Sequence, residues 1–362
     1  MRLLNTQTLR LESFANEHLT PPYAILSHTW GTGEVLFNDV HEQEEEDPEW
    51  KRKGPASKIL KSAEQASREG LRYIWIDTVC IDKSSSAELS EAINSMFEWY
   101  QRATVCYAYI ADIQEVQDLS RCRWLRRGWT LQELIAPGHV VFYNQQWNQI
   151  GTRESLADDL ASLTKIDREL LRREHFADVE QLLAYTGTAT KMSWAADRHT
   201  TKKEDRAYCL MGIFKVNMPL LYGEGNRAFQ RLQEEILKDT TDTSILAYNP
   251  SRFQSSLLAP SPVRFTHSLT ALWEASSPLR FSNRQITFET LVCPLRGSST
   301  QGGDCAAILD CYFDRDAFSR AALILSPWGS AKGVFSKALG GKLFRLQEPN
   351  LLLDIKTGEC KG

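Results

Sequence analysis

Four short apolar segments alternate with amphipathic ones between residues 23 and 144, and this alternation constrains the fold more than any other feature of the chain. The apolar segments, each typical of a buried strand, are YAILSH (23–28), LRYIWIDTVCID (71–82), ATVCYAYIAD (103–112) and HVVFYN (139–144). The segments between them have helical patterns. Strands joined by helical crossovers pair in parallel with right-handed connections, so the sequence predicts an α/β fold around a parallel sheet.

The predicted helices are SKILKSAEQASREG (57–70), ELSEAINSMFEWYQR (88–102) and WTLQELIA (129–136). In the second, apolar residues recur every three or four positions, as on one face of a helix. Gly70 ends the first helix, and Pro137 ends the third because its ring and missing N–H cannot continue a helix. The first 20 residues, with Leu3, Leu9 and Leu11, predict a short hairpin.

The pattern changes twice after residue 150. Helical spacing dominates 152–240, in SLADDLASLTKI, VEQLLAYTGTATKMSWAADR, KEDRAYCLMGIF and NRAFQRLQEEIL. From about residue 243, short strand-like runs such as TSILAYN, CAAILDCYF and AALILSPW are separated by Gly, Pro, Ser and Asn. We therefore expect a mainly β region over 243–362.

Charge and cysteine usage exclude several classes of protein. The net charge of −4 gives no sequence-wide attraction to nucleic acid or to an anionic membrane. No apolar run is long enough to span a bilayer, and the N-terminus is too polar for a secretory signal, so we expect a cytoplasmic protein without a membrane span. The eight cysteines form no Cys-x-x-Cys pair, which predicts buried thiols and no metal site.

Polar and aromatic residues follow the carboxyl ends of the predicted strands, where open parallel sheets bind ligands. Ser27, His28 and Trp30 lie at the end of the first predicted strand. Asp77 lies at the end of the second, and Asp112 at the end of the third. Glu133 and Trp129 lie on the short helix after the third strand. A polar rim with aromatic neighbours is typical of a pocket for a polar, ring-containing ligand.

Each of these residues also has a purely structural interpretation. Ser27 and His28 can end a strand, Asp77 can accept backbone N–H groups in a turn, and Trp129 can belong to the core. Glu133 can form a surface ion pair with Arg126 or Arg127. A Ser/His/Asp triad is disfavoured because Ser27 and His28 are adjacent in a strand and point to opposite faces.

A second, weaker candidate is LYGEGNRAF (221–229), where Gly223 and Gly225 precede a helix that Asn226 can cap. The start of such a helix can bind a phosphate, although a plain loop is the simpler interpretation.

The chain resembles the fungal heterokaryon-incompatibility (HET) domain family over roughly residues 1–240. The resemblance is carried by YAILSHTWG (23–31), YIWIDTVCIDK (73–83), MFEWYQRATVCYAYIAD (96–112), RGWTLQELIAP (127–137) and DRAYCLMGIFKVNMPLLYGEGNRAF (205–229). It implies nonself recognition between fungal strains and cell death on activation. It also implies a HET domain over 1–240, with an α/β core at about 20–150, a helical extension over 152–240, and the β-rich region over 243–362.

The HET family is in turn distantly similar to TIR domains, which are flavodoxin-like parallel sheets and many of which cleave NAD⁺. WTLQEL places Glu133 at the position of the catalytic glutamate of TIR domains. The resemblance implies NAD⁺ as substrate, with no required cofactor, and cleavage of the nicotinamide–ribose bond. Ser27 or His28 is then expected at a phosphate or ribose, Trp30 or Trp129 at a base ring, and Arg126 or Arg127 at the pyrophosphate. Asp77 is expected among the residues that bind the ligand.

Two further interpretations stay open from the sequence. In one, the chain is a non-enzymatic signalling module that triggers cell death through self-association or assembly with other incompatibility proteins. In the other, the β-rich region binds a ligand or restrains the HET domain.

Overall fold

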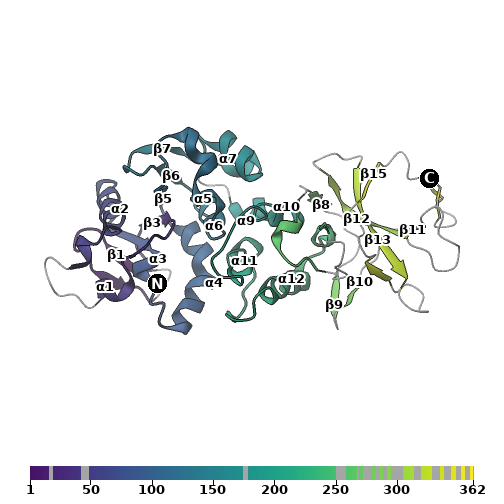
Figure 1. Ribbon diagram of the computed structural model, residues 1–362, viewed down its shortest axis with the longest axis horizontal. Helices are drawn as coiled ribbons and strands as arrows, with labels where there is room; N and C mark the ends of the chain where they lie inside the picture. Colours follow the sequence, from purple (N-terminus) through teal and green to yellow (C-terminus); the bar gives the residue numbers. More distant parts are fainter. Residues whose placement is uncertain are drawn as a thin grey trace. The chain divides into compact units, whose positions relative to one another are not determined.

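The computed structural model describes residues 1–15, 19–41, 49–173, 178–249 and 258–266, and the strand segments between residues 269 and 361 (Figure 1). The chain divides into two compact units. The first comprises Met1–Val179, Arg198–Thr201 and Tyr208–Leu220, and the second comprises Glu180–Asp197, Lys202–Ala207 and Leu221–Gly362. The domain boundary near residue 240 stays a prediction.

A mostly parallel sheet forms the centre of the first unit, in the strand order β2-β1-β4-β3-β5-β6-β7. The strands β4, β3, β5 and β6 run parallel, while the β1–β2 hairpin on one side and β7 on the other pair antiparallel. The strands are β1 (Arg2–Asn5), β2 (Leu11–Ser13), β3 (Tyr23–His28), β4 (Tyr73–Ile76), β5 (Val105–Tyr109), β6 (Val140–Tyr143) and β7 (Gln149–Thr152). The order of the parallel strands, second-first-third-fourth along the chain, is that of flavodoxin-like sheets. The predicted fold class and the N-terminal hairpin are confirmed.

Helices cover both faces of this sheet. The helical elements of the first unit are α1 (Phe37–His41), η2 (Glu49–Arg52), α2 (Ala56–Arg68), α3 (Asp77–Cys80), α4 (Ser86–Arg102), η3 (Val116–Arg121), α5 (Arg123–Arg126), α6 (Thr130–Ile135), α7 (Ala157–Thr164), α8 (Arg168–Arg172) and η4 (Gly212–Phe214). Helix α9 (Val179–Ala184) belongs mostly to the second unit. Helix α2 packs on β3 and β4, whereas α6 packs on β3 and on α4. Ser27 and His28 are consecutive in β3, and Ser27 contacts α6 whereas His28 contacts α2. The two helices therefore lie on opposite faces of the sheet.

Helix α4 shows why the amphipathic pattern was informative. Ser85 begins it, since the Ser85 hydroxyl accepts a hydrogen bond from the Glu88 backbone N–H at 3.3 Å. The predicted apolar stripe is buried, and each large side chain contributes about 1.5–3 kcal/mol through removal of its surface from water. Its buried members are Ala92, Ile93, Met96, Phe97, Trp99 and Tyr100.

The second predicted strand was too long. Strand β4 ends at Ile76, opposite Leu26 of β3, and Asp77–Cys80 instead form the helical turn α3. The turn begins where the pairing with β3 ends, and the Ile76 backbone N–H donates to the Cys80 sulfur at 3.3 Å. Apolar content alone did not distinguish the buried turn from a strand.

The second unit begins with short helices and continues into antiparallel strands. Its helical elements are α10 (Thr188–Ser193), α11 (Asp205–Tyr208, shared with the first unit), α12 (Arg227–Asp239), η5 (Thr243–Leu246) and η6 (Pro262–Arg264). TSILAYN was predicted as strand-like, but Asp242 accepts the Ser244 N–H at 2.9 Å and starts the helical turn η5.

The C-terminal strands are β8 (Leu269–Ala271), β9 (Arg280–Ser282), β10 (Gln285–Thr287), β11 (Val292–Pro294), β12 (Cys305–Phe313), β13 (Ser319–Pro327), β14 (Phe335–Lys337), β15 (Phe344–Gln347), β16 (Leu352–Asp354) and β17 (Glu359–Lys361). Every pairing among them is antiparallel within the described segments, and the longest joins β12 to β13.

Two further expectations concern membranes and thiols. Among the described residues, no helix is both long and apolar enough to cross a membrane. Five cysteines are buried thiols, as expected: Cys80, Cys106, Cys122, Cys209 and Cys311.

Gly212 offers a test of the packing behind α4. A Cβ atom there would lie 2.2 Å from the Cβ of Phe97. We expect G212A to lower the free energy of unfolding by about 1–3 kcal/mol through overpacking. In G54A the added Cβ meets nothing within 4 Å, so that control should change stability by less than about 0.5 kcal/mol. Equal urea midpoints for the two variants would contradict this packing.

Candidate functional site

The predicted site residues come from the carboxyl ends of neighbouring parallel strands. Ser27 and His28 end β3, and Asp77 follows β4, whose last residue pairs with Leu26. Glu133 lies on α6, which follows β5 and packs on β3. The topology therefore brings residues that are far apart in the sequence to one edge of the sheet.

Glu133 is buried, with 7% of its surface exposed. The Ser27 hydroxyl donates a hydrogen bond to its carboxylate. The Trp124 indole N–H in turn donates to the Ser27 oxygen at 2.8 Å, which fixes the direction of the Ser27 hydroxyl. The Tyr100 hydroxyl, which donates to the Leu26 carbonyl at 3.3 Å, also acts to lower the pKa of Glu133. Glu133 is therefore no surface partner of Arg126 or Arg127, and its orientation is set from inside the protein.

Burial raises the pKa of Glu133 from 4.5 to about 7. The hydrogen bond from Ser27 opposes this rise, the negative charge of Asp77 adds to it, and the positive charge of Arg127 opposes it. A carboxyl group with a pKa near 7 changes its protonation state close to neutral pH, as many catalytic acids and bases do.

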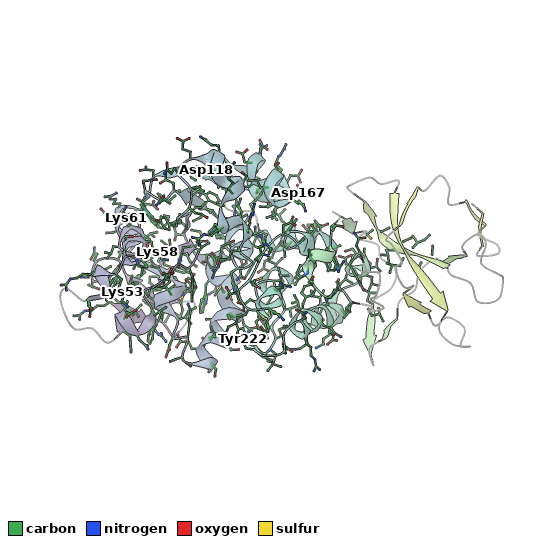
Figure 2. The ribbon with its side chains drawn as sticks, viewed as in Figure 1. Lys53, Lys58, Lys61, Asp118, Asp167 and Tyr222 are labelled. Carbon is green, nitrogen blue, oxygen red and sulfur yellow. The ribbon has the colours of Figure 1, made fainter. Side chains whose placement is uncertain are left out.

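His28 belongs to a second network on the other face of β3. Its Nε2 lies 3.0 Å from Asp77 Oδ1, and its Nδ1 lies 2.9 Å from the Lys58 ammonium. Lys58, labelled in Figure 2, also donates to Glu34 at 2.5 Å. Ser27 and His28 thus serve different networks, as strand alternation predicted.

Asp77 connects the second network to Trp30. The Trp30 indole N–H donates to Asp77 Oδ2 at 2.9 Å, which fixes the plane of the ring. Burial of Asp77 opposes ionisation, but the charge of Lys83 and the contact with His28 outweigh it, so the pKa of Asp77 lies well below its ordinary value. Asp77 is therefore a stable negative charge at neutral pH.

Cations surround the Trp30 ring. The Lys83 ammonium lies 3.5 Å from the ring centroid, and the Arg127 guanidinium carbon lies 5.9 Å from it. Both distances are within the range of cation–π interactions.

The structure brings most of the predicted site residues together. Ser27 and Glu133 share one network, His28, Trp30 and Asp77 share another, and Arg127 lies beside Trp30. Trp129 is half-buried at the start of α6. The tryptophan that contacts Ser27 is Trp124.

Sequence analysis also missed Tyr100, Lys58 and Lys83. Lys83 follows IDTVCID directly, so its position after the second strand was a usable signal. Lys58 and Tyr100 lie on helices whose periodicity indicated only which residues face the sheet.

Residues 23–120 match the model of the family described as heterokaryon incompatibility protein (HET). The chain carries a HET domain. Over 233 residues it is 44% identical to the vegetative incompatibility protein HET-E-1 of Podospora anserina, a match that covers 60% of this chain and 16% of that protein. The chain thus matches only a small part of its relative. No solved structure matches.

The family match includes Ser27, His28, Trp30, Asp77 and the lysines of the second network, and Glu133 lies beyond its last residue. The structure nevertheless joins Glu133 to the HET domain through Ser27, so the candidate site combines residues from inside and outside the matched range.

Two buried arginines hold the C-terminal end of α6, next to Glu133. Arg153 donates to the carbonyl oxygens of Pro137 at 2.6 Å and Gly138 at 2.7 Å, and to that of Leu134 at 3.2 Å. Arg173 donates to the Pro137 carbonyl at 2.7 Å and to that of Ile135. The last carbonyls of a helix lack partners within it and carry partial negative charge, which these cations satisfy.

The second candidate of the sequence, the Gly223–Gly225 loop, already holds an anion of its own chain. The backbone N–H groups of Gly223 and Gly225 both donate to Glu204 Oε1 at 2.9 Å. Both glycines have positive φ, of 106° and 62°, which aims the two N–H groups at one point. Asn226 makes no side-chain cap. The loop is thus a carboxylate cradle within the second unit.

The raised pKa of Glu133 predicts an effect on stability that does not depend on any reaction. Below about pH 4.5 the carboxyl is protonated in the folded and unfolded states, and above about pH 7 it is ionised in both. The folded state therefore loses about 3 kcal/mol of stability as the pH rises through this window. E133Q does not titrate, so we expect its stability relative to the parent to rise by about this amount between pH 4.5 and 8. A constant difference in urea unfolding across this range would contradict the buried carboxyl.

Arg153 and Arg173, which hold the end of α6, form an arginine clamp. We expect the removal of one of the two guanidinium groups to cause a large loss of stability. R153M removes the donor of the Gly138 carbonyl and one of the two donors of the Pro137 carbonyl, which Arg173 still contacts, and a buried group left without a partner costs about 1–3 kcal/mol. R168M removes an arginine that is 59% exposed and pairs with Asp158, so we expect less than about 1 kcal/mol. Similar losses in the two variants, measured by thermal unfolding, would show that the clamp does not stabilise α6.

Proposed function

We propose that the chain acts in vegetative incompatibility as a cell-death effector that cleaves NAD⁺ at the nicotinamide–ribose bond, with Glu133 as the catalytic carboxylate. The HET domain and the name of the relative favour the biological role. Since the match covers only 16% of that relative, its role is extended to this chain as part of the proposal.

The observation that carries the enzymatic part is the Glu133 carboxylate, buried and oriented by Ser27 at the edge of the sheet where parallel α/β folds bind ligands. An ion pair does not account for the position of Glu133, because the group that donates a hydrogen bond to its carboxylate is the neutral hydroxyl of Ser27. The similarity of WTLQEL to the catalytic helix of TIR domains suggested the same residue.

The chemistry suits a single carboxylate. When the bond between the ribose C1′ and the nicotinamide nitrogen breaks, nicotinamide leaves with the bonding electrons as a neutral base. Positive charge then builds up on the ribose, as in glycoside hydrolysis, and an ionised carboxylate beside the sugar stabilises it. Water adds to C1′ and releases a proton, giving ADP-ribose. A general acid is not required, because the leaving group needs no proton.

Neighbouring residues are assigned supporting roles in this proposal. Ser27 and Trp124 orient the carboxylate, and Trp30 offers a ring face at the same edge. His28 and Asp77 bind each other and hold Trp30, so we assign them to shaping the site. Trp129 stays a candidate for stacking on a base. Self-association and contact with other incompatibility proteins belong to the same proposal.

The test is nicotinamide release from NAD⁺ by concentrated protein. We expect E133Q to lose about 10²–10³-fold in kcat through loss of the charge that stabilises the transition state. E98Q makes the same chemical change on a half-exposed glutamate of α4 that pairs with Arg102, and should match the parent. Parent activity should also rise with pH through about 7, as Glu133 ionises.

Equal turnover by E133Q and the parent would remove Glu133 from the reaction. A parallel assay of cell killing distinguishes the non-enzymatic alternative: a folded E133Q that kills as well as the parent would favour a signalling module that acts by assembly.

A further inference from the structure

The Lys83 ammonium is buried, yet it has no hydrogen-bond partner among the described residues. Its nearest carboxylate oxygen, Asp77 Oδ2, is 3.6 Å away, which is longer than a normal hydrogen bond. An ammonium carries three donors, and leaving them unused in a buried place costs free energy. An ammonium of this kind at the edge of a candidate site is expected to donate hydrogen bonds to a bound ligand.

The neighbouring lysine shows the contrast. Lys58 donates to Glu34 and lies 2.9 Å from His28, so its donors are used within the protein. Lys83 lies 3.5 Å from the ring centroid of Trp30 and forms an ion pair with Asp77 at 3.6 Å, beyond hydrogen-bond distance. A ring face attracts a cation without accepting a conventional hydrogen bond, so it leaves these donors available.

Arg127 adds a second cation to the same ring. Lys83 and Arg127 repel each other, as the lowering of the Lys83 pKa by Arg127 in addition to burial shows. Asp77 acts on Lys58, Lys83 and Arg127 alike, and Glu34 pairs with Lys58. Three cations thus face Asp77 and Glu34, and Arg127 also acts on Glu133, whose pKa is about 7. While Glu133 is protonated, one positive charge is in excess. A group with more than one negative charge would remove both the repulsion and the excess.

We infer that Lys83 and Arg127 bind the diphosphate of a nucleotide ligand beside Trp30. Arginine presents a planar pair of donors that suits phosphate oxygens, and lysine contributes a compact charge. Trp30 is held in place by its hydrogen bond to Asp77. The inference deepens the proposed function, on which it rests for the identity of the nucleotide, because it assigns Lys83 to the diphosphate half of NAD⁺.

The anion site is tested without catalysis by calorimetric titration with ADP and, as the uncharged comparison, adenosine. We expect K83M to weaken ADP binding at least tenfold, and to change adenosine binding by less than twofold. K83R, which keeps the charge, should recover most of the ADP affinity. K61M removes an equal charge from the exposed face of α2, where Figure 2 labels Lys61, and should bind ADP as the parent does. If K83M unfolds, K83Q replaces it.

Kinetics separate this inference from the proposed function. K83M should raise the KM for NAD⁺ at least tenfold while leaving the cleavage of nicotinamide riboside, which lacks phosphate, unchanged. A parent that does not bind ADP, or a K83M that binds it equally well, overturns the diphosphate site even if NAD⁺ is cleaved through Glu133. Lys83-dependent ADP binding without any NAD⁺ cleavage supports the site and rejects the reaction.

Discussion

The structure around the candidate site depends on keeping one carboxyl group inside the protein. A helix of six residues, α6, carries Glu133, and such a short helix has little stability of its own. Arg153 and Arg173 hold its last carbonyls, while at its start Arg198 donates to Thr130 Oγ1 and to the Arg127 carbonyl, both at 3.0 Å. The buried cations thereby fix the backbone that presents Glu133 to Ser27.

The two networks at the sheet edge differ in whether neutral or charged groups contact the acid. Glu133 accepts from the Ser27 hydroxyl, which itself accepts from the Trp124 indole, and burial raises the pKa of Glu133 to about 7, whereas Asp77 lies among cations that keep it ionised. Two acids at the same edge therefore differ in protonation behaviour because their neighbours differ. Pairs of this kind often mark sites with distinct chemical roles.

Much of the fold and part of the site could be predicted from the sequence. Strands β3, β5 and β6, helix α4 and the stop at Pro137 follow from periodicity and from proline chemistry, which act locally. The rule that ligands bind at strand ends also brought Ser27, Asp77 and Glu133 together. The partners could not be predicted in the same way: whether Trp124 or Trp129 reaches Ser27 depends on how the turn before α6 is oriented, and the length of β4 depends on where its neighbour stops pairing. Arg153 and Arg173 are ordinary charged residues in the sequence, and only their burial against α6 shows their importance.

The alternation of Ser27 and His28 along β3 has a consequence for how this protein can vary. Inserting or deleting a single residue within Tyr23–Leu26 would turn both side chains over, so that the serine faced Lys58 and the histidine faced Glu133. A substitution in this strand changes one side chain, whereas a change in its length would exchange the partners of both networks at once. Changes of length should therefore be confined to the loops on either side of β3.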